Sequence, residues 1–123
     1  DASILQGPSA GAAFTIITVA AIEGKEINPT VRITGSINHD GSVGPAGKIK
    51  AKAIGSAQNN ATILFVPLGT SLEYIDKEYC NDYGIFKDYC QTDYIPAYID
   101  ESIEGLDVIE IRYVDEAFEY FFI

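Results

Sequence analysis

Histidine is almost absent from this chain, which has a single one, His39, among its 123 residues. The common triad of serine hydrolases needs a histidine as its general base. His39 is followed by Asp40 and Gly41, a sequence typical of a hairpin turn, and we expect it to be a solvated turn residue. A serine–histidine–aspartate triad is therefore disfavoured.

Positive charge and long apolar runs are also scarce. Eight lysines and arginines stand against 18 acids, which leaves a formal net charge of −10. Because binding to a phosphate backbone depends on clustered cations, this balance disfavours a nucleic-acid partner. The best apolar stretch, residues 10–22, falls well short of the roughly 20 residues that cross a bilayer. We expect no membrane span within this chain.

Only two cysteines are present, Cys80 and Cys90, within an acidic segment rich in tyrosine. Without a supporting pair of histidines they are a poor zinc signal, and we expect no metal and no cofactor. Ten residues apart, they are suited to closing a small disulfide loop, and two free thiols are the alternative. A disulfide favours an extracellular location, or the outer face of a membrane, over the cytoplasm.

The composition, 47% apolar, is that of a globular chain with one hydrophobic core, and we predict one domain over residues 1–123. Helices are expected to alternate with strands in an α+β (α/β layer) fold whose second half has short parallel units. The first helix is expected to be buried on all sides. Residues 69–105 have no dependable period and are predicted to be an inserted loop, with a partly helical stretch at 72–77. The predicted elements are helix 10–23 ending at Gly24, strand 31–37, helix 48–58, strand 61–67, strand 106–112 and helix 114–123.

A serine near the start of the chain has a sequence context that suits a nucleophile. Gly7-Pro8-Ser9-Ala10-Gly11 predicts a tight turn that places Ser9 at the first turn of a helix. An ordinary helix cap is the alternative interpretation of this string. A serine hydroxyl needs a base, and a desolvated lysine can serve where histidine is missing. Lys52 is the favoured candidate, although Lys48 and Lys50 compete with it on spacing alone.

Three strings together resemble the proteolytic domain of Lon proteases, peptidase family S16. They are Gly7 to Gly11, then Thr34-Gly35, then Gly44-Pro45-Ala46-Gly47 with the helix start that leads to Lys52. Thr34 follows Ser9 by 25 residues and Lys52 follows it by 43, as in the family pattern. The match is good over about residues 6–68 and looser over 106–123. It is closest to archaeal Lon-like serine peptidases that lack a fused ATPase.

The resemblance implies a fold and roles for individual residues. The fold would be related to the ribosomal protein S5 domain 2-like fold. Ser9 would be the nucleophile, Lys52 the general base, and Thr34 the residue that orients the lysine amine. Backbone N–H groups of the turn, around Gly7, Pro8 and Ala10, would receive the oxyanion. The implied activity is ATP-independent hydrolysis of peptide bonds in polypeptide substrates.

The chain also departs from the family pattern. Lys48 stands where the family usually has the second of two glycines. Strands that normally precede the nucleophile are not found here, so we expect a C-terminal portion of the domain, with an upstream fragment or a separate ATPase chain as a partner. The resemblance further implies a homo-oligomeric ring, commonly of six subunits. The segment 69–105 is longer than expected and could serve as a lid, a partner surface or a brace.

Two alternatives from other functional classes remain open. The helix start behind Gly7-Pro8-Ser9 also resembles the phosphate-holding loop of small-metabolite kinases, because free N–H groups at a helix start bind anions. The chain lacks the paired serines of that loop and has no P-loop. A non-catalytic binding or assembly domain of the same fold, using the tyrosine-rich segment, is the other alternative.

Overall fold

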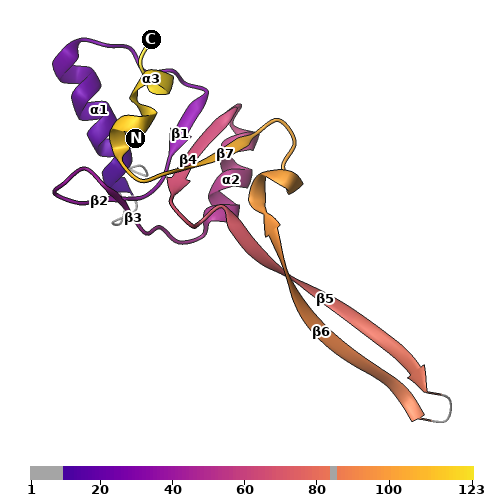
Figure 1. The fold of residues 1–123 in the computed structure, drawn as a ribbon. Coiled ribbons are helices and arrows are strands. Elements are labelled where there is room, and N and C mark those ends of the chain that lie inside the picture. The colour runs from indigo at the N-terminus through magenta and orange to yellow at the C-terminus, as the bar shows by residue number, and fades with distance from the viewer. Residues whose placement is uncertain (1–9, 84–85) are drawn as a thin grey trace.

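The computed structural model describes residues 10–83 and 86–123, which combine helices with short strands and one long hairpin (Figure 1). The predicted α+β class is confirmed. In chain order the elements are α1 (Gly11–Glu23), β1 (Val31–Ile33), β2 (Ser36–Ile37), β3 (Val43–Gly44), α2 (Ile49–Gln58), β4 (Ile63–Pro67), β5 (Leu72–Tyr83), β6 (Phe86–Tyr98), the 3-10 turn η3 (Ile99–Ser102), β7 (Asp107–Ile111), the 3-10 turn η4 (Val114–Ala117) and α3 (Phe118–Phe121).

The core is built around a three-stranded parallel sheet with the order β1-β4-β7. The central strand β4 is buried on both faces because its side chains alternate between two hydrophobic clusters. Phe65 points into the cluster formed with α1 and α3, whereas Leu64 and Val66 join the cluster formed with α2. The sequence-based prediction of a doubly covered strand is confirmed. The two clusters contain Ala12, Ile16, Val31, Phe65, Ile111, Val114, Ala117 and Phe121 on one face, and Ile49, Ala53, Ala61, Leu64, Val66, Ile99, Leu106 and Val108 on the other.

The first helix is covered along one line only, so the prediction of burial on all sides is wrong. Ala12, Ile16 and Ala20, spaced four residues apart, are buried against the sheet. Phe14 and Ile17 are 41% and 42% exposed, because one face of a sheet covers only one side of a helix. Gly24 ends α1 as predicted, in a left-handed conformation with its N–H bonded to the Ala20 carbonyl. Within residues 10–83 and 86–123, no helix has both the length and the apolar character to cross a membrane.

The predicted strand 31–37 is two strands that belong to different sheets. β1 pairs in parallel with β4, whereas β2 pairs antiparallel with β3. The chain changes direction at Gly35, whose φ of 141° is rarely adopted by a residue with a side chain. The two sheets therefore meet at the Thr34-Gly35 step, and the β2–β3 hairpin turns through His39 and Gly41 as the sequence predicted.

The remaining helices differ from prediction mainly at the C-terminus. α2 begins within a residue of its predicted start and ends at the predicted residue. The closing helix predicted for 114–123 is instead the turn η4 followed by the short α3. The start of η4 is fixed by Glu116, whose carboxylate accepts hydrogen bonds from the N–H groups of Arg112 and Tyr113 at 2.8 and 2.7 Å. These contacts tighten the first turn and favour the 3-10 geometry.

Residues 69–105 are mostly strand, so the predictions of a loop and of a helical stretch at 72–77 are wrong. β5 and β6 pair antiparallel along nearly their whole length and form a twisted ribbon that extends away from the core (Figure 1). Pairing between the two tyrosine-rich segments provides hydrogen-bonding partners for their backbone N–H and C=O groups. A paired strand has no need of a helical period in its sequence. The ribbon does not extend toward α1 and β1, so it does not cover them as a lid (Figure 1).

The ribbon is fixed at its base and closed near its far end. At the base, the Ser71 N–H and hydroxyl donate to the Glu110 carboxylate at 3.0 and 2.5 Å, and these bonds lower the pKa of Glu110. The Ile99 N–H donates to the Ser71 carbonyl at 2.9 Å. Toward the far end, Cys80 and Cys90 lie opposite each other in register and form a disulfide. The ribbon therefore carries its own covalent brace.

We predict that the disulfide stabilises the ribbon and not the core. Because neither core cluster includes a described residue of β5 or β6, a variant with Cys80→Ser and Cys90→Ser should unfold within about 2 °C of the wild type. Hydrogen exchange of β5 and β6 amides should become faster, since loop closure no longer restricts the open ribbon. Reduction of the wild type should add the mass of two hydrogen atoms. An unchanged mass, or a large fall in the core melting temperature, would contradict this assignment.

Candidate active site

Thr34 sits at the end of β1, where the parallel sheet stops. Its N–H donates to the Phe65 carbonyl at 3.0 Å, which ties it to the central strand. The residue is only 5% exposed. Since Gly35 turns the chain immediately afterwards, the Thr34 hydroxyl is held at a fixed place beside the sheet edge. A buried hydroxyl needs a hydrogen-bonding partner, and one comes from α2.

The start of α1 is fastened to the same place. The Ala12 N–H donates to the Gly35 carbonyl at 3.0 Å. Gly11 lies so close to β2 that a Cβ atom on it would stand 3.0 Å from the Ile37 nitrogen. A small residue is therefore required at the first position of the helix. These two contacts place the beginning of α1 beside the Thr34-Gly35 step.

Lys52 reaches Thr34 from the opposite element, α2. Ile49 and Ala53 anchor α2 in the core, and Lys52, next to Ala53, is half-buried. Its Nζ donates a hydrogen bond to Thr34 Oγ1 at 3.1 Å. Burial lowers the pKa of the Lys52 amine, and the positive charge of Lys48 lowers it further. The structure therefore joins two of the residues that the sequence singled out and makes the lysine easier to deprotonate.

A cavity of about 860 Å³ contains both partners. Ala13 and Ile17 line it from α1 together with Ala10 just before that helix, Thr34 lines it just after β1, and Lys52 lines it from α2. Ala10 directly follows Ser9 in the chain. Gly7, Pro8 and Ser9 themselves lie outside the described residues, and their predicted roles stay predictions. The structure thus brings together Ala10, Thr34 and Lys52.

Sequence reasoning missed other residues at this site. Arg32 and Asn59 also line the cavity, and the Arg32 guanidinium donates to the Pro29 carbonyl and, at 3.2 Å, to that of Val31. Lys48 has a left-handed backbone, with φ of 57°, immediately before α2. The family usually has a glycine at the position of Lys48, and glycine adopts a left-handed backbone most readily. The sequence therefore indicated this conformation. Neither Arg32 nor Asn59 stands in a motif that marks it.

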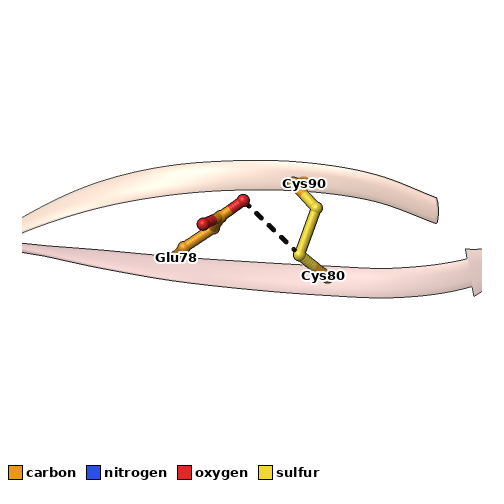
Figure 2. Close-up of side chains that lie close together, drawn as sticks. All are labelled: Glu78, Cys80 and Cys90. Carbon is orange, nitrogen blue, oxygen red and sulfur yellow. Dashed lines mark hydrogen bonds between the residues drawn. A yellow bond between two sulfur atoms is a disulfide. The ribbon is translucent and has the colours of Figure 1, made fainter.

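Among residues 10–83 and 86–123, one group of potential metal ligands lies on the ribbon, and none of its members lines the cavity. A Glu78 carboxylate oxygen stands 3.7 Å from Cys80 Sγ, as Figure 2 shows. Cys80 and Cys90 are bonded to each other, so neither sulfur is available as the thiolate that binds a metal. A disulfide sulfur also carries no proton to donate, and the short distance is a simple contact. His39, the other residue type of interest, is exposed in the β2–β3 turn.

Comparison with known proteins identifies the family. Residues 2–83 match the model of the Lon protease (S16) C-terminal proteolytic domain. A Lon protease of Metamycoplasma arthritidis (strain 158L3-1) is 28% identical over 116 residues, which are 94% of this chain and 11% of that protein. A mitochondrial Lon protease homolog of Candida albicans (strain SC5314 / ATCC MYA-2876) is 32% identical over 94% of this chain and 9% of its own length. Lon protease 1 of Bacillus subtilis (strain 168) is 29% identical over 93% of this chain and 12% of its own.

The chain spans about a tenth of the length of the curated relatives it matches. These relatives are bacterial and eukaryotic, and they give no support to the closer resemblance to archaeal peptidases without a fused ATPase. The family model covers the cavity residues Ala10, Thr34 and Lys52 together with the beginning of the ribbon. This chain belongs to the Lon protease (S16) C-terminal proteolytic domain family.

Proposed function

We propose that this chain hydrolyses peptide bonds as a serine peptidase, with Ser9 as nucleophile and Lys52 as general base. The observation that carries the proposal is the 3.1 Å hydrogen bond from Lys52 Nζ to Thr34 Oγ1, in a cavity that also contains Ala10, the residue after Ser9. Membership of the Lon proteolytic family supports the same activity. The substrate class is an extended polypeptide.

The chemistry needs a neutral lysine, and the site favours one. Burial lowers the pKa of the Lys52 amine, so a larger fraction is neutral near pH 7 than for a solvated lysine. Thr34 accepts one hydrogen bond from the amine and thereby fixes its direction. The amine's lone pair is left for the Ser9 hydroxyl proton.

In the proposed reaction, Lys52 takes the proton of Ser9 Oγ as the oxygen attacks the carbonyl carbon of the substrate. The oxyanion that forms is stabilised by backbone N–H groups at the start of α1, the positive end of that helix. The protonated Lys52 then passes its proton to the departing amine, which leaves an acyl group on Ser9. Water, deprotonated by Lys52, releases the acid and restores the serine.

Covalent labelling of the full chain tests this function directly. A fluorophosphonate probe should label the wild type, and peptide mass mapping should place the adduct on Ser9. The Ser9→Ala variant should lose the label, because only an activated serine reacts at a useful rate. Ser3→Ala, in the same segment of the chain, is the matched control and should keep it.

Each other outcome decides against the proposal. A wild type that neither reacts nor cleaves casein would favour a non-catalytic assembly domain. A melting temperature that rises with added nucleotide would favour the kinase-like phosphate site. Assembly into a ring, a partner ATPase chain, ATP-independent action and an extracytoplasmic location stay predictions beside this proposal.

A further inference from the structure

The ribbon of β5 and β6 is fixed in shape although it packs into neither core cluster. It extends away from α1 and β1, which line the cavity (Figure 1). Its base is tied by the hydrogen bond from Ser71 to Glu110, and Cys80 and Cys90 join its two strands covalently. A two-stranded ribbon without such ties is only marginally stable in water. A surface that already has its bound shape loses less entropy when a partner binds, so these ties suit a docking surface.

One face of the ribbon carries exposed tyrosine and leucine side chains. Leu72 is paired in register with Tyr98, and Tyr94 lies an even number of residues before Tyr98 on the same strand. Because side chains alternate along a strand, these three share one face. Tyr94 is 68% exposed, Tyr98 55% and Leu72 39%. Tyrosine is enriched where proteins contact partners, since its ring gives apolar contact area and its hydroxyl can still form hydrogen bonds.

The same face carries a carboxylate. Glu78 is paired in register with Thr92, two residues before Tyr94, so Glu78 and Tyr94 are diagonal neighbours on the ribbon. Glu78 is exposed, and its carboxylate lies beside the bond between Cys80 and Cys90 (Figure 2). A carboxylate near an exposed tyrosine ring can pair with a cation that also stacks on the ring. Leu72, Glu78, Tyr94 and Tyr98 are called the tyrosine face below.

The charge of the ribbon indicates what the tyrosine face can bind. The whole chain has a formal net charge of −10, and acids also outnumber lysines within the ribbon. Like charges repel a second copy of this chain, a nucleic acid or an anionic membrane surface. Arginine and lysine side chains have the complementary charge and stack on tyrosine rings. The charged residues of the ribbon are Glu73, Asp76, Lys77, Glu78, Asp82, Lys87, Asp88 and Asp93.

We propose that the tyrosine face binds an extended segment, rich in arginine and lysine, of a partner protein. The cations of the segment stack on the rings of Tyr94 and Tyr98, and one of them pairs with Glu78. None of these residues lines the cavity, so the inference does not depend on the proposed peptidase activity. The disulfide keeps the two strands in register while the partner is bound.

Peptide binding to the full chain tests this surface. The wild-type ribbon is used in the Ser9→Ala background, so that no bound peptide is cleaved. A fluorescent peptide of alternating arginine and serine, as long as β5, should bind with an affinity that falls as salt is added. Fluorescence anisotropy gives the Kd. Tyr94→Ser should raise the Kd about five-fold, because a cation–π contact is lost, and Glu78→Gln should raise it about three-fold.

The chain offers a matched control for each substitution. Tyr113 lies outside the ribbon and is 41% exposed, and Glu119 is an exposed carboxylate on α3. Ile95, next to Tyr94, is on the opposite face of the ribbon. Tyr113→Ser, Glu119→Gln and Ile95→Ser should leave the Kd unchanged, and thermal unfolding checks that every variant is folded. The variant with both cysteines changed to serine should raise the Kd about three-fold while its core stays folded.

Four results would overturn the proposal. The first is no binding of the arginine peptide, or equally tight binding of an alternating glutamate–serine peptide. The second is an equal loss of affinity in a ribbon variant and its control, which would show that binding is not confined to the tyrosine face. The third is a dimer that Tyr94→Ser dissociates, which would assign the face to a second copy. The fourth is cleavage of the arginine peptide by the wild type that Tyr94→Ser slows, which would make the peptide a substrate and not a partner.

Discussion

Replacing Lys52 by methionine should lower kcat/KM for peptide cleavage by about 10³-fold or more while the protein stays folded. Methionine keeps most of the volume of the side chain but cannot accept the serine proton. It also removes the donor to Thr34 Oγ1. Since the substitution takes a desolvated charge out of the helix, the melting temperature should stay within about 4 °C of the wild type. Steady-state kinetics and thermal unfolding measure both effects.

Two further variants show whether the loss comes from proton transfer. Lys52→Arg keeps a positive donor but cannot be deprotonated in a protein, and it should be as inactive as Lys52→Met. Lys50→Met, an exposed position two residues earlier on α2, should keep activity within a few-fold of the wild type. An active Lys52→Arg enzyme would rule out the lysine as base.

The pH dependence has a definite sign. Because the folded state lowers the pKa of Lys52, activity should rise with pH through that lowered value as the amine becomes neutral. The free energy of unfolding depends on pH through the same group. Below the pKa that Lys52 has in the folded state, the amine is charged and desolvated, and this lowers the free energy of unfolding by its full amount. The penalty falls as the pH rises from the folded pKa to the ordinary one. At alkaline pH, the free energy of unfolding of the wild type should therefore rise relative to that of Lys52→Met.

The parts of the fold that the sequence predicted are those with strong local signals. The apolar stretch around Leu64 to Val66 predicted the buried central strand, and Gly24 predicted the end of α1. Both signals depend on residues next to one another in the chain. A continuous apolar strand needs cover on two faces, and a glycine after a helix provides the left-handed cap.

The errors arose where distant contacts decide the structure. Phe14 and Ile17 are apolar, yet the sheet reaches only the other side of α1. Residues 72–77 could be helical by local preference, but they pair with the segment that ends at Tyr98. Pairing with a partner so far along the chain is a distant contact, which local sequence preference does not report.

The candidate site was predictable in part. The spacing of Thr34 and Lys52 in the family pattern indicated two partners, and the structure places their side-chain atoms 3.1 Å apart. Spacing could not show that Lys48 takes a left-handed backbone, since that depends on how the chain enters α2. Nor could it assign Arg32 to the cavity, because a strand residue gives no local sign of what it faces.

Gly35→Ala should have the largest effect on stability among the glycine substitutions at the site, about 3 kcal/mol or more. Gly35 has φ of 141°, a backbone conformation that is strained for any residue with a Cβ atom. It would also overlap Val43 Cγ1 and stand 3.2 Å from both the Gly44 carbonyl oxygen and Pro67 Cγ. A carbonyl in a paired strand and a proline ring cannot easily move, so the Thr34-Gly35 step must shift.

Gly41→Ala is the matched control for this effect. Gly41 also has a positive φ, 85°, but a Cβ atom there would meet nothing within 4 Å. The control should cost only the backbone term, about 1 kcal/mol, and should leave peptide cleavage unchanged. Chemical denaturation gives the two free energies of unfolding, and kinetics on the folded fraction give the activity. Because Gly35 holds both the Ala12 N–H and the position of Thr34, Gly35→Ala should reduce cleavage even where it is folded. Equal losses in the free energy of unfolding for the two variants would show that the close packing around Gly35 does not affect stability. A folded Gly35→Ala enzyme with full activity would show that this packing is not needed to hold Thr34 beside Lys52.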